Sequence, residues 1–102
     1  MQTITIEAQD VEAAVRKAKA PNFQYEWMVK CCPVYQALKR LGYPVLCVAH
    51  VDWSDTEGNA YKLPAALQEV TARIPEEWAG IETPISVEVD WTPSQAAAVS
   101  RD

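Results

Sequence analysis

The sequence lacks the motifs and the long apolar segment that are typical of several classes of enzyme and of membrane proteins. It has only three glycines and no Gly-rich phosphate loop, and it contains neither a Ser-centred nucleophile motif nor paired carboxylates at helical spacing with an accompanying histidine. It also lacks a run of about 20 apolar residues, the length that spans a bilayer. These absences make an enzyme the weaker class and favour a protein without membrane contact.

Cysteine is also scarce, and its number is odd. The chain has three cysteines, and its first residues lack the basic start and the apolar core of a secretory signal peptide. We therefore expect free thiols and a location in the reducing cytoplasm, which is the cytoplasm of the host cell if a phage encodes the protein.

A thiol or metal site would have to be built from Cys31, Cys32, Cys47 and the only histidine, His50. Cys32 precedes a predicted helix, whose dipole favours the thiolate, and His50 is the obvious base for it. However, cysteine also packs as a small apolar residue, and adjacent cysteines chelate one ion poorly. We predict no catalytic residue, no metal and no cofactor. A small-molecule-binding or thiol-dependent function at the Cys31-Cys32 turn is kept as the alternative.

Basic residues are rare in the second half of the chain. Residues 50–102 contain ten acids and three bases, a balance of −7, whereas residues 1–49 contain four acids and six bases, a balance of +2. Because phosphate binding needs a basic surface, direct nucleic-acid binding is disfavoured. An acidic face suits a basic partner or an imitation of a phosphate backbone, and it serves equally as a solvated surface.

Apolar spacing and helix-ending residues predict a small α+β protein. Pro33 and Gly42 bracket the clearest helix, and the apolar residues between them recur at helical spacing. The predicted order is β-α-α-β-β-α-β, with strands over 2–7, 45–53, 60–63 and 85–91 and helices over 10–19, 33–41 and 64–74.

We expect one mainly antiparallel, four-stranded sheet with about three helices packed on one face. Asp10 is the predicted N-cap of the first helix. The aromatic segment 23–30 is predicted as either an extended segment or a loop that covers the core. Residues 1–91 form the predicted single domain, and residues 92–102 form a flexible C-terminal tail.

The start of the central helix resembles a known pattern. The segment from Cys32 to Arg40, Cys-Pro-Val-Tyr-Gln-Ala-Leu-Lys-Arg, is similar to the helix start Cys-Pro-x-x-x-Ala-Leu-x-Arg of small bacteriophage and mobile-element proteins. The resemblance covers roughly residues 2–91 and departs at Cys31 and at the aromatic loop before it. It implies a phage-like context, in which small acidic proteins often inhibit by contact, as anti-CRISPR and other anti-defence proteins do.

These features predict an inhibitor that binds a host protein by steric block or by nucleic-acid mimicry. A basic, nucleic-acid-binding defence effector fits such a partner. Acids surround Trp53 at a predicted hairpin tip, as they surround aromatic anchors at interfaces, although Trp53 can equally close the core. The predicted binding residues, drawn from the acidic half, are Asp52, Trp53, Asp55, Glu57, Glu76, Glu77, Glu88 and Asp90. A structural homodimer that pairs through the strand over 85–91 is a further alternative, so monomer and homodimer both stay open.

Overall fold

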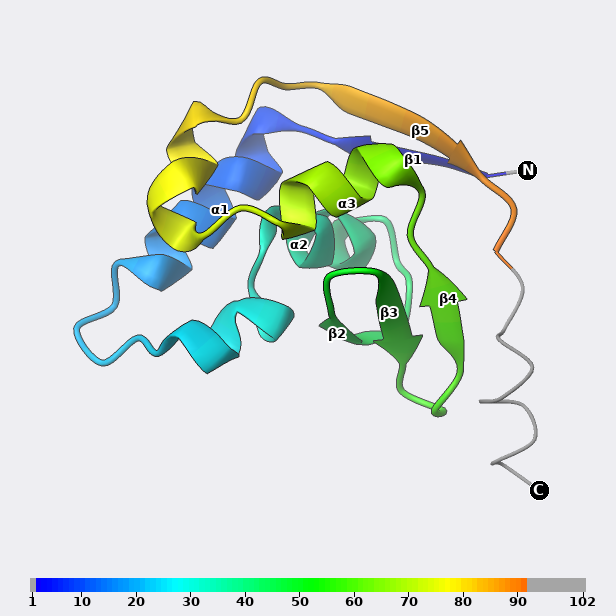
Figure 1. Ribbon diagram of the computed structural model, residues 1–102, viewed down its shortest axis with the longest axis horizontal. Coiled ribbons are helices and arrows are strands. Elements are labelled where there is room, and N and C mark those ends of the chain that lie inside the picture. Colours follow the sequence, from blue (N-terminus) through cyan, green and yellow to red (C-terminus); the bar gives the residue numbers. More distant parts are fainter. Residues whose placement is uncertain (1, 92–102) are drawn as a thin grey trace.

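The computed structural model describes residues 2–91, and the predicted C-terminal tail over 92–102 lies outside the described residues. The described elements, in chain order, are β1 (Gln2–Ile6), α1 (Ala8–Ala18), η1 (Tyr25–Lys30), α2 (Pro33–Arg40), β2 (Val45–Val48), β3 (Asp52–Asp55), β4 (Ala60–Lys62), α3 (Ala65–Thr71), η2 (Pro75–Gly80) and β5 (Ile85–Val89), where η marks a 3-10 helix. The described chain combines helices with antiparallel strands, which confirms the predicted α+β class (Figure 1).

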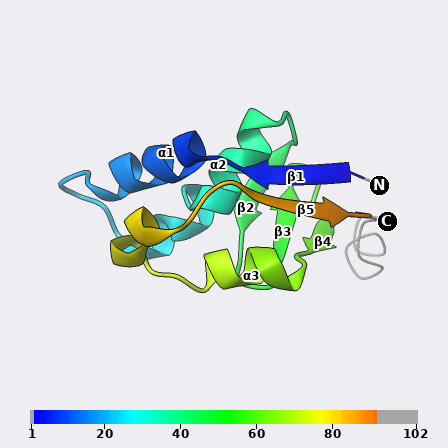
Figure 2. The same ribbon diagram turned by 90° about the horizontal axis from the view of Figure 1, so that it is seen from above.

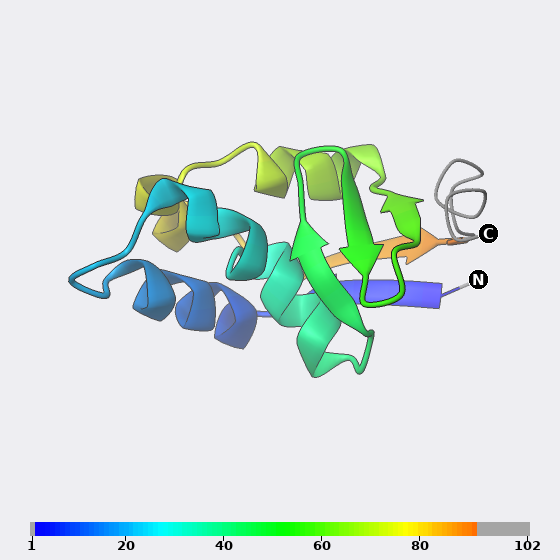
Figure 3. The ribbon, with the colours of Figure 1, turned by 90° about the horizontal axis from the view of Figure 1, so that it is seen from below.

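The strands form two antiparallel sheets rather than one. β1 pairs with β5 in a register that places Ile4 opposite Val87, and β2, β3 and β4 form a second sheet in that order. Seen from above, β1 and β5 lie side by side across the molecule (Figure 2). The three-stranded sheet lies on the opposite side, where it is visible from below (Figure 3).

The central helix α2 lies between these two sheets. It contacts β1 and β2, and it also packs against α1 and α3. The prediction that the helices pack on one face of a single sheet is therefore wrong. Pro33 occupies the first turn and Gly42 follows the helix with φ +91°, as their positions predict. Val34, Ala37 and Leu38 of the predicted apolar stripe are fully buried at the centre of the core, but Leu41, which was predicted to share this stripe, is 40% exposed.

The predicted strand over 45–53 is wrong, because a turn divides it into β2 and β3. The backbone N–H of Ala49 donates to the carbonyl of Asp52 at 2.8 Å, which reverses the chain. His50 and Val51 lie in this turn and are exposed. The continuous apolar run therefore includes residues that are not core, and it produces five strands instead of four.

Two helix boundaries also differ from the prediction. α1 begins after Glu7, and Asp10 lies in the first turn, where its carboxylate accepts the backbone N–H of Glu7 at 2.8 Å. Asp10 therefore caps the helix from inside rather than as the N-cap itself. α3 ends at Thr71, and Ile74 is 46% exposed instead of sharing the buried face.

An ion pair between the exposed Arg40 and the buried Asp10 ties the first half of the fold together. The Arg40 guanidinium donates to Asp10 Oδ1 at 2.9 Å and Oδ2 at 3.0 Å, and it also donates to the backbone carbonyl of Thr5 at 2.8 Å. These bonds join α2 to α1 and β1, and they raise the pKa of Arg40. None of the described helices combines the length and the apolar character that a membrane span requires.

Candidate functional site

Trp53 is a core residue, so the interpretation of its indole as an exposed anchor is wrong. The side chain is 2% exposed, and its ring stacks on that of Tyr61 with 4.4 Å between the ring centroids. Tyr43 and Trp91 present ring edges to it at 5.9 and 5.2 Å. These four rings, here called the aromatic cluster, close the space between the three-stranded sheet and the end of β5.

Asp55 is also directed inward and cannot form part of a contact surface. The carboxylate accepts hydrogen bonds from the backbone N–H groups of Glu57 and Asn59, both at 2.9 Å, from Asn59 Nδ2 at 3.0 Å and from the Tyr61 hydroxyl at 2.7 Å. Burial alone raises the pKa of Asp55, but these hydrogen bonds outweigh it and lower the pKa to about 2. Asp55 therefore shapes the turn between β3 and β4.

Asp55 makes the stability of the fold depend on acid pH. Folding lowers its pKa from 3.8 to about 2, so the charged carboxylate stabilises the fold above pH 4 and this stabilisation is lost as the pH falls toward 2. Asp55→Asn is expected to lower the free energy of unfolding by about 2 kcal/mol at pH 7, and the difference from wild type should shrink toward pH 2. Urea unfolding at both pH values measures this. Asp90→Asn, at an exposed carboxylate, is the control, and an Asp55→Asn effect that is equal at both pH values would contradict the assignment.

The six remaining predicted residues do not come together on one surface. Glu76 and Glu77 belong to η2, whereas Glu88 and Asp90 lie in and just after β5. Asp52 and Glu57 belong to the three-stranded sheet and its second turn. Because η2 and β4 lie at opposite ends of the long axis, the acidic half of the sequence is spread over the molecule (Figure 1).

The two adjacent cysteines are buried at the start of α2. Cys32 is 4% exposed, and burial raises its pKa to about 11 although nearby backbone N–H groups favour the thiolate. Burial also raises the pKa of Cys31. Both groups are therefore protonated thiols at neutral pH, which disfavours the thiol-dependent alternative.

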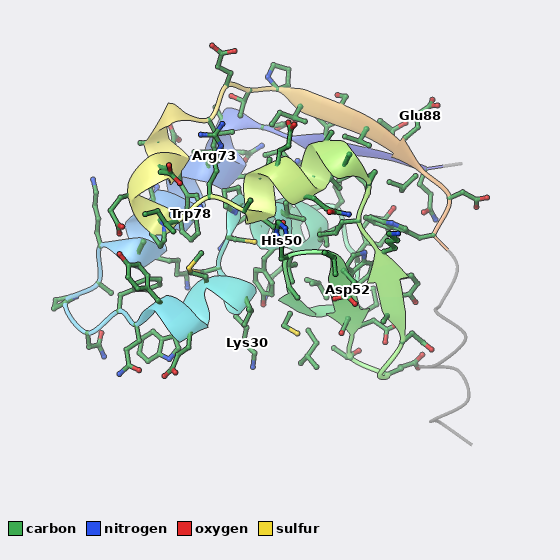
Figure 4. The ribbon with its side chains drawn as sticks, viewed as in Figure 1. Lys30, His50, Asp52, Arg73, Trp78 and Glu88 are labelled. Atoms are coloured by element: carbon green, nitrogen blue, oxygen red, sulfur yellow. The ribbon has the colours of Figure 1, made fainter. Side chains whose placement is uncertain are left out.

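The cysteines and the histidine that were considered as metal ligands do not form a cluster. The part of the chain that the structure describes contains no group of three His, Cys, Asp or Glu side chains positioned to hold a metal ion. His50 is exposed in the β2–β3 turn, where its carbonyl accepts the Thr71 hydroxyl at 2.7 Å. Figure 4 shows its ring beneath α3.

A different surface, which the sequence prediction missed, is formed by η1. The aromatic segment is neither a strand nor a loop but a 3-10 helix, and the backbone carbonyl of Met28 accepts N–H groups from Cys31 at 3.1 Å and Cys32 at 3.0 Å. Three of its large side chains are exposed, at 59% for Tyr25, 43% for Trp27 and 37% for Val29. Alternation of aromatic and polar residues was the signal available in the sequence, and it indicates a strand as readily as a surface.

Trp27 and Val29 line a groove of about 580 Å³, here called the η1 groove, whereas Tyr25 lies outside its lining. Its wall on the other side is the C-terminal end of α1 and the loop that follows. Its lining includes the charged, aromatic and apolar side chains of Lys17, Phe23, Glu26, Trp27, Val29 and Lys30. Phe23 meets Trp27 edge to face with 6.2 Å between the centroids, and most of the groove surface is apolar.

Contacts beyond η1 hold this segment in place. The Tyr25 hydroxyl donates to Glu76 Oε2 at 2.6 Å, which joins η1 to η2 and raises the pKa of Tyr25. At the start of η1, the N–H of Trp27 donates to the carbonyl of Gln24 at 2.9 Å. Met28 packs inward against the core. The exposed side chains are therefore presented on a segment that Met28 fixes to the core and that Tyr25 joins to η2.

Lysines lie along the rim of the η1 groove. The charged residues that line the groove are Lys17, Lys30 and Glu26, a balance of +1 on a chain with a net charge of −5. Figure 4 shows Lys30 extending outward from η1. The groove thus combines an apolar floor, an aromatic lip and a positive rim on a protein that is otherwise acidic.

Comparisons with known proteins place this surface in no family. No family model matches the sequence, and no curated protein or solved structure is significantly similar to it.

Proposed function

We propose that the protein works by binding another protein through the η1 groove. The observation that carries this proposal is the exposure of Trp27 and Val29 in the lining of this groove, whose surface is mostly apolar. An exposed apolar surface of this kind marks interaction sites in monomeric proteins. Trp and Tyr are also the residues that most often dominate the binding energy of protein interfaces.

The fixed position of η1 supports the same function. A segment that is already ordered loses little conformational entropy when a partner binds, so its exposed side chains contribute more of their contact energy to affinity. The hydrogen bond between Tyr25 and Glu76 and the inward packing of Met28 provide that order.

Steric block is the form of inhibition that we propose for a phage-like context. Nucleic-acid mimicry would need acids that follow one continuous surface, and the acidic residues lie instead on η2, on β5 and on the three-stranded sheet. A groove with aromatic anchors can cover a functional surface of a host protein without any chemical step.

Quantitative affinity capture from an extract of the host cell tests this function. A double variant with Trp27→Ala and Val29→Ser removes two exposed groove side chains. We expect the amount of partner that it captures to fall at least about tenfold relative to wild type. Val51→Ser is the control, because Val51 is a valine that is more exposed than Val29, at 48% against 37%, but lies in the β2–β3 turn. Equal recovery of the same proteins by wild type and both variants would overturn the proposal, provided that thermal unfolding shows all three to be folded.

A further inference from the structure

We infer that the η1 groove takes an acidic amphipathic helix of its partner. This inference rests on the proposed function, because it names the chemistry of what docks in the same groove. Charge is the first argument. Lys17 and Lys30 flank an apolar floor against the single carboxylate of Glu26, so the charged residues that line the groove carry a net positive charge. A segment with apolar side chains on one face and carboxylates beside them complements both features.

The walls of the groove favour a helix over a strand. α1 and η1 are both helical, so their backbone hydrogen bonds are made within the segments and no strand edge lines the groove. An extended peptide would therefore find no ladder of backbone donors and acceptors with which to pair. A helix satisfies its own backbone and offers apolar side chains at i, i+3, i+4 and i+7, which is the pattern that grooves between helices accept.

Two other negatively charged partners fit the groove less well. Nucleic acid would place phosphates beside Glu26 on a chain with a net charge of −5, and the floor is apolar rather than polar. An anionic membrane is entered by protruding apolar side chains, whereas this surface is hollowed between α1 and η1. Both become outcomes of the test.

The probe is a fluorescent peptide of about 16 residues with Leu and Phe at helical i, i+3, i+4, i+7 spacing and Glu at the other positions. Its matched control replaces every Glu by Lys. Fluorescence anisotropy of the full-length protein with each peptide measures the dissociation constant. We expect the acidic peptide to bind at least about tenfold more tightly than the basic one, and its binding to weaken several-fold when salt rises from about 0.05 to 0.5 M.

Variants then locate the bound peptide on the protein. Lys17→Glu combined with Lys30→Glu should weaken the acidic peptide at least about tenfold, whereas Lys62→Glu, on β4 at the far end of the molecule, should change binding less than about twofold. The charge variants leave the buried core untouched, and thermal unfolding checks that they fold.

Several results would overturn the inference. These are equal binding of the two peptides, an equal effect of Lys62→Glu, or displacement of the acidic peptide by duplex DNA or anionic vesicles at lower concentrations than by unlabelled peptide. A dimer that forms without peptide and is lost with Trp27→Ala would make a second copy the occupant. If the acidic peptide fails to bind while capture still depends on Trp27, the inference falls and the proposed function stands. If capture does not depend on Trp27, the proposed function falls as well.

Discussion

Trp53→Ala is expected to lower the free energy of unfolding by about 3–5 kcal/mol, the range for removing a buried aromatic side chain. The indole is 2% exposed and contacts Tyr43, Tyr61 and Trp91 in the aromatic cluster. Removing it leaves a cavity where the three-stranded sheet meets the chain after β5. Because Trp91 Nε1 also donates to the carbonyl of Lys62 at 2.9 Å, loss of packing in the cluster should loosen that connection too.

Urea unfolding of Trp53→Ala beside Trp27→Ala makes this test internally controlled. Trp27 is 43% exposed, so its removal should cost less than about 1 kcal/mol although the residue deleted is the same. Trp53→Phe should cost less than Trp53→Ala, because Trp53 Nε1 makes no hydrogen bond with any described residue and only volume is lost. Equal costs for Trp27→Ala and Trp53→Ala would contradict the assignment of one to the surface and the other to the core.

Asp10→Ala is expected to lower the free energy of unfolding by about 2–3 kcal/mol, somewhat less than for a fully buried pair because the Arg40 side chain is 28% exposed. The substitution removes both acceptors of the Arg40 guanidinium and leaves its charge beside the carbonyl of Thr5. It also removes the acceptor of the Glu7 N–H at the start of α1. The contacts among α1, α2 and β1 should weaken together.

Thermal or urea unfolding measures this loss, and Glu12→Ala is the control on the same helix. Glu12 is exposed, so its removal should change the free energy of unfolding by less than about 0.5 kcal/mol. The loss of unfolding free energy in Asp10→Asn should lie between those in Asp10→Ala and Glu12→Ala, because asparagine keeps an acceptor but removes the charge. An Asp10→Ala variant as stable as Glu12→Ala would show that the ion pair does not hold these elements together.

Elements with complete local signals could be predicted from the sequence. Pro33 and Gly42 mark the ends of α2 through their own backbone geometry, and the residues between them carry a helical stripe. β5 shows strict alternation, and Val89 is buried beside exposed Glu88. In each case the deciding interactions lie within a few residues.

Two segments whose sequence patterns fit more than one structure could not be predicted. The run over 45–53 is apolar at nearly every position, so its pattern does not mark the turn in which the Ala49 N–H donates to the Asp52 carbonyl and Val51 is exposed. η1 has the alternation of a strand, but its position depends on Glu76, which is 51 residues from Tyr25.

The candidate site could not be predicted because it forms between segments that meet only in the folded protein. Both the aromatic and the basic residues of the η1 groove are visible in the sequence, since aromatic residues alternate with polar ones over 23–27 and bases outnumber acids in residues 1–49. These residues come together only through tertiary packing, which places the C-terminal end of α1 opposite η1. The acids around Trp53 predicted a contact surface that does not exist there, because the Asp55 carboxylate is directed inward by its hydrogen bonds with Asn59 and Tyr61.

The most direct test of the η1 groove as the binding surface is the indole N–H spectrum of the four tryptophans in ¹⁵N-labelled protein during titration with a binding fragment of the partner. Trp27 lines the groove, whereas Trp53 and Trp78 are buried and Trp91 lies after β5. We predict that the Trp27 signal shifts most and that the signals of Trp53 and Trp78 stay in place. A spectrum in which the Trp91 signal moves while the Trp27 signal is unchanged would contradict the account.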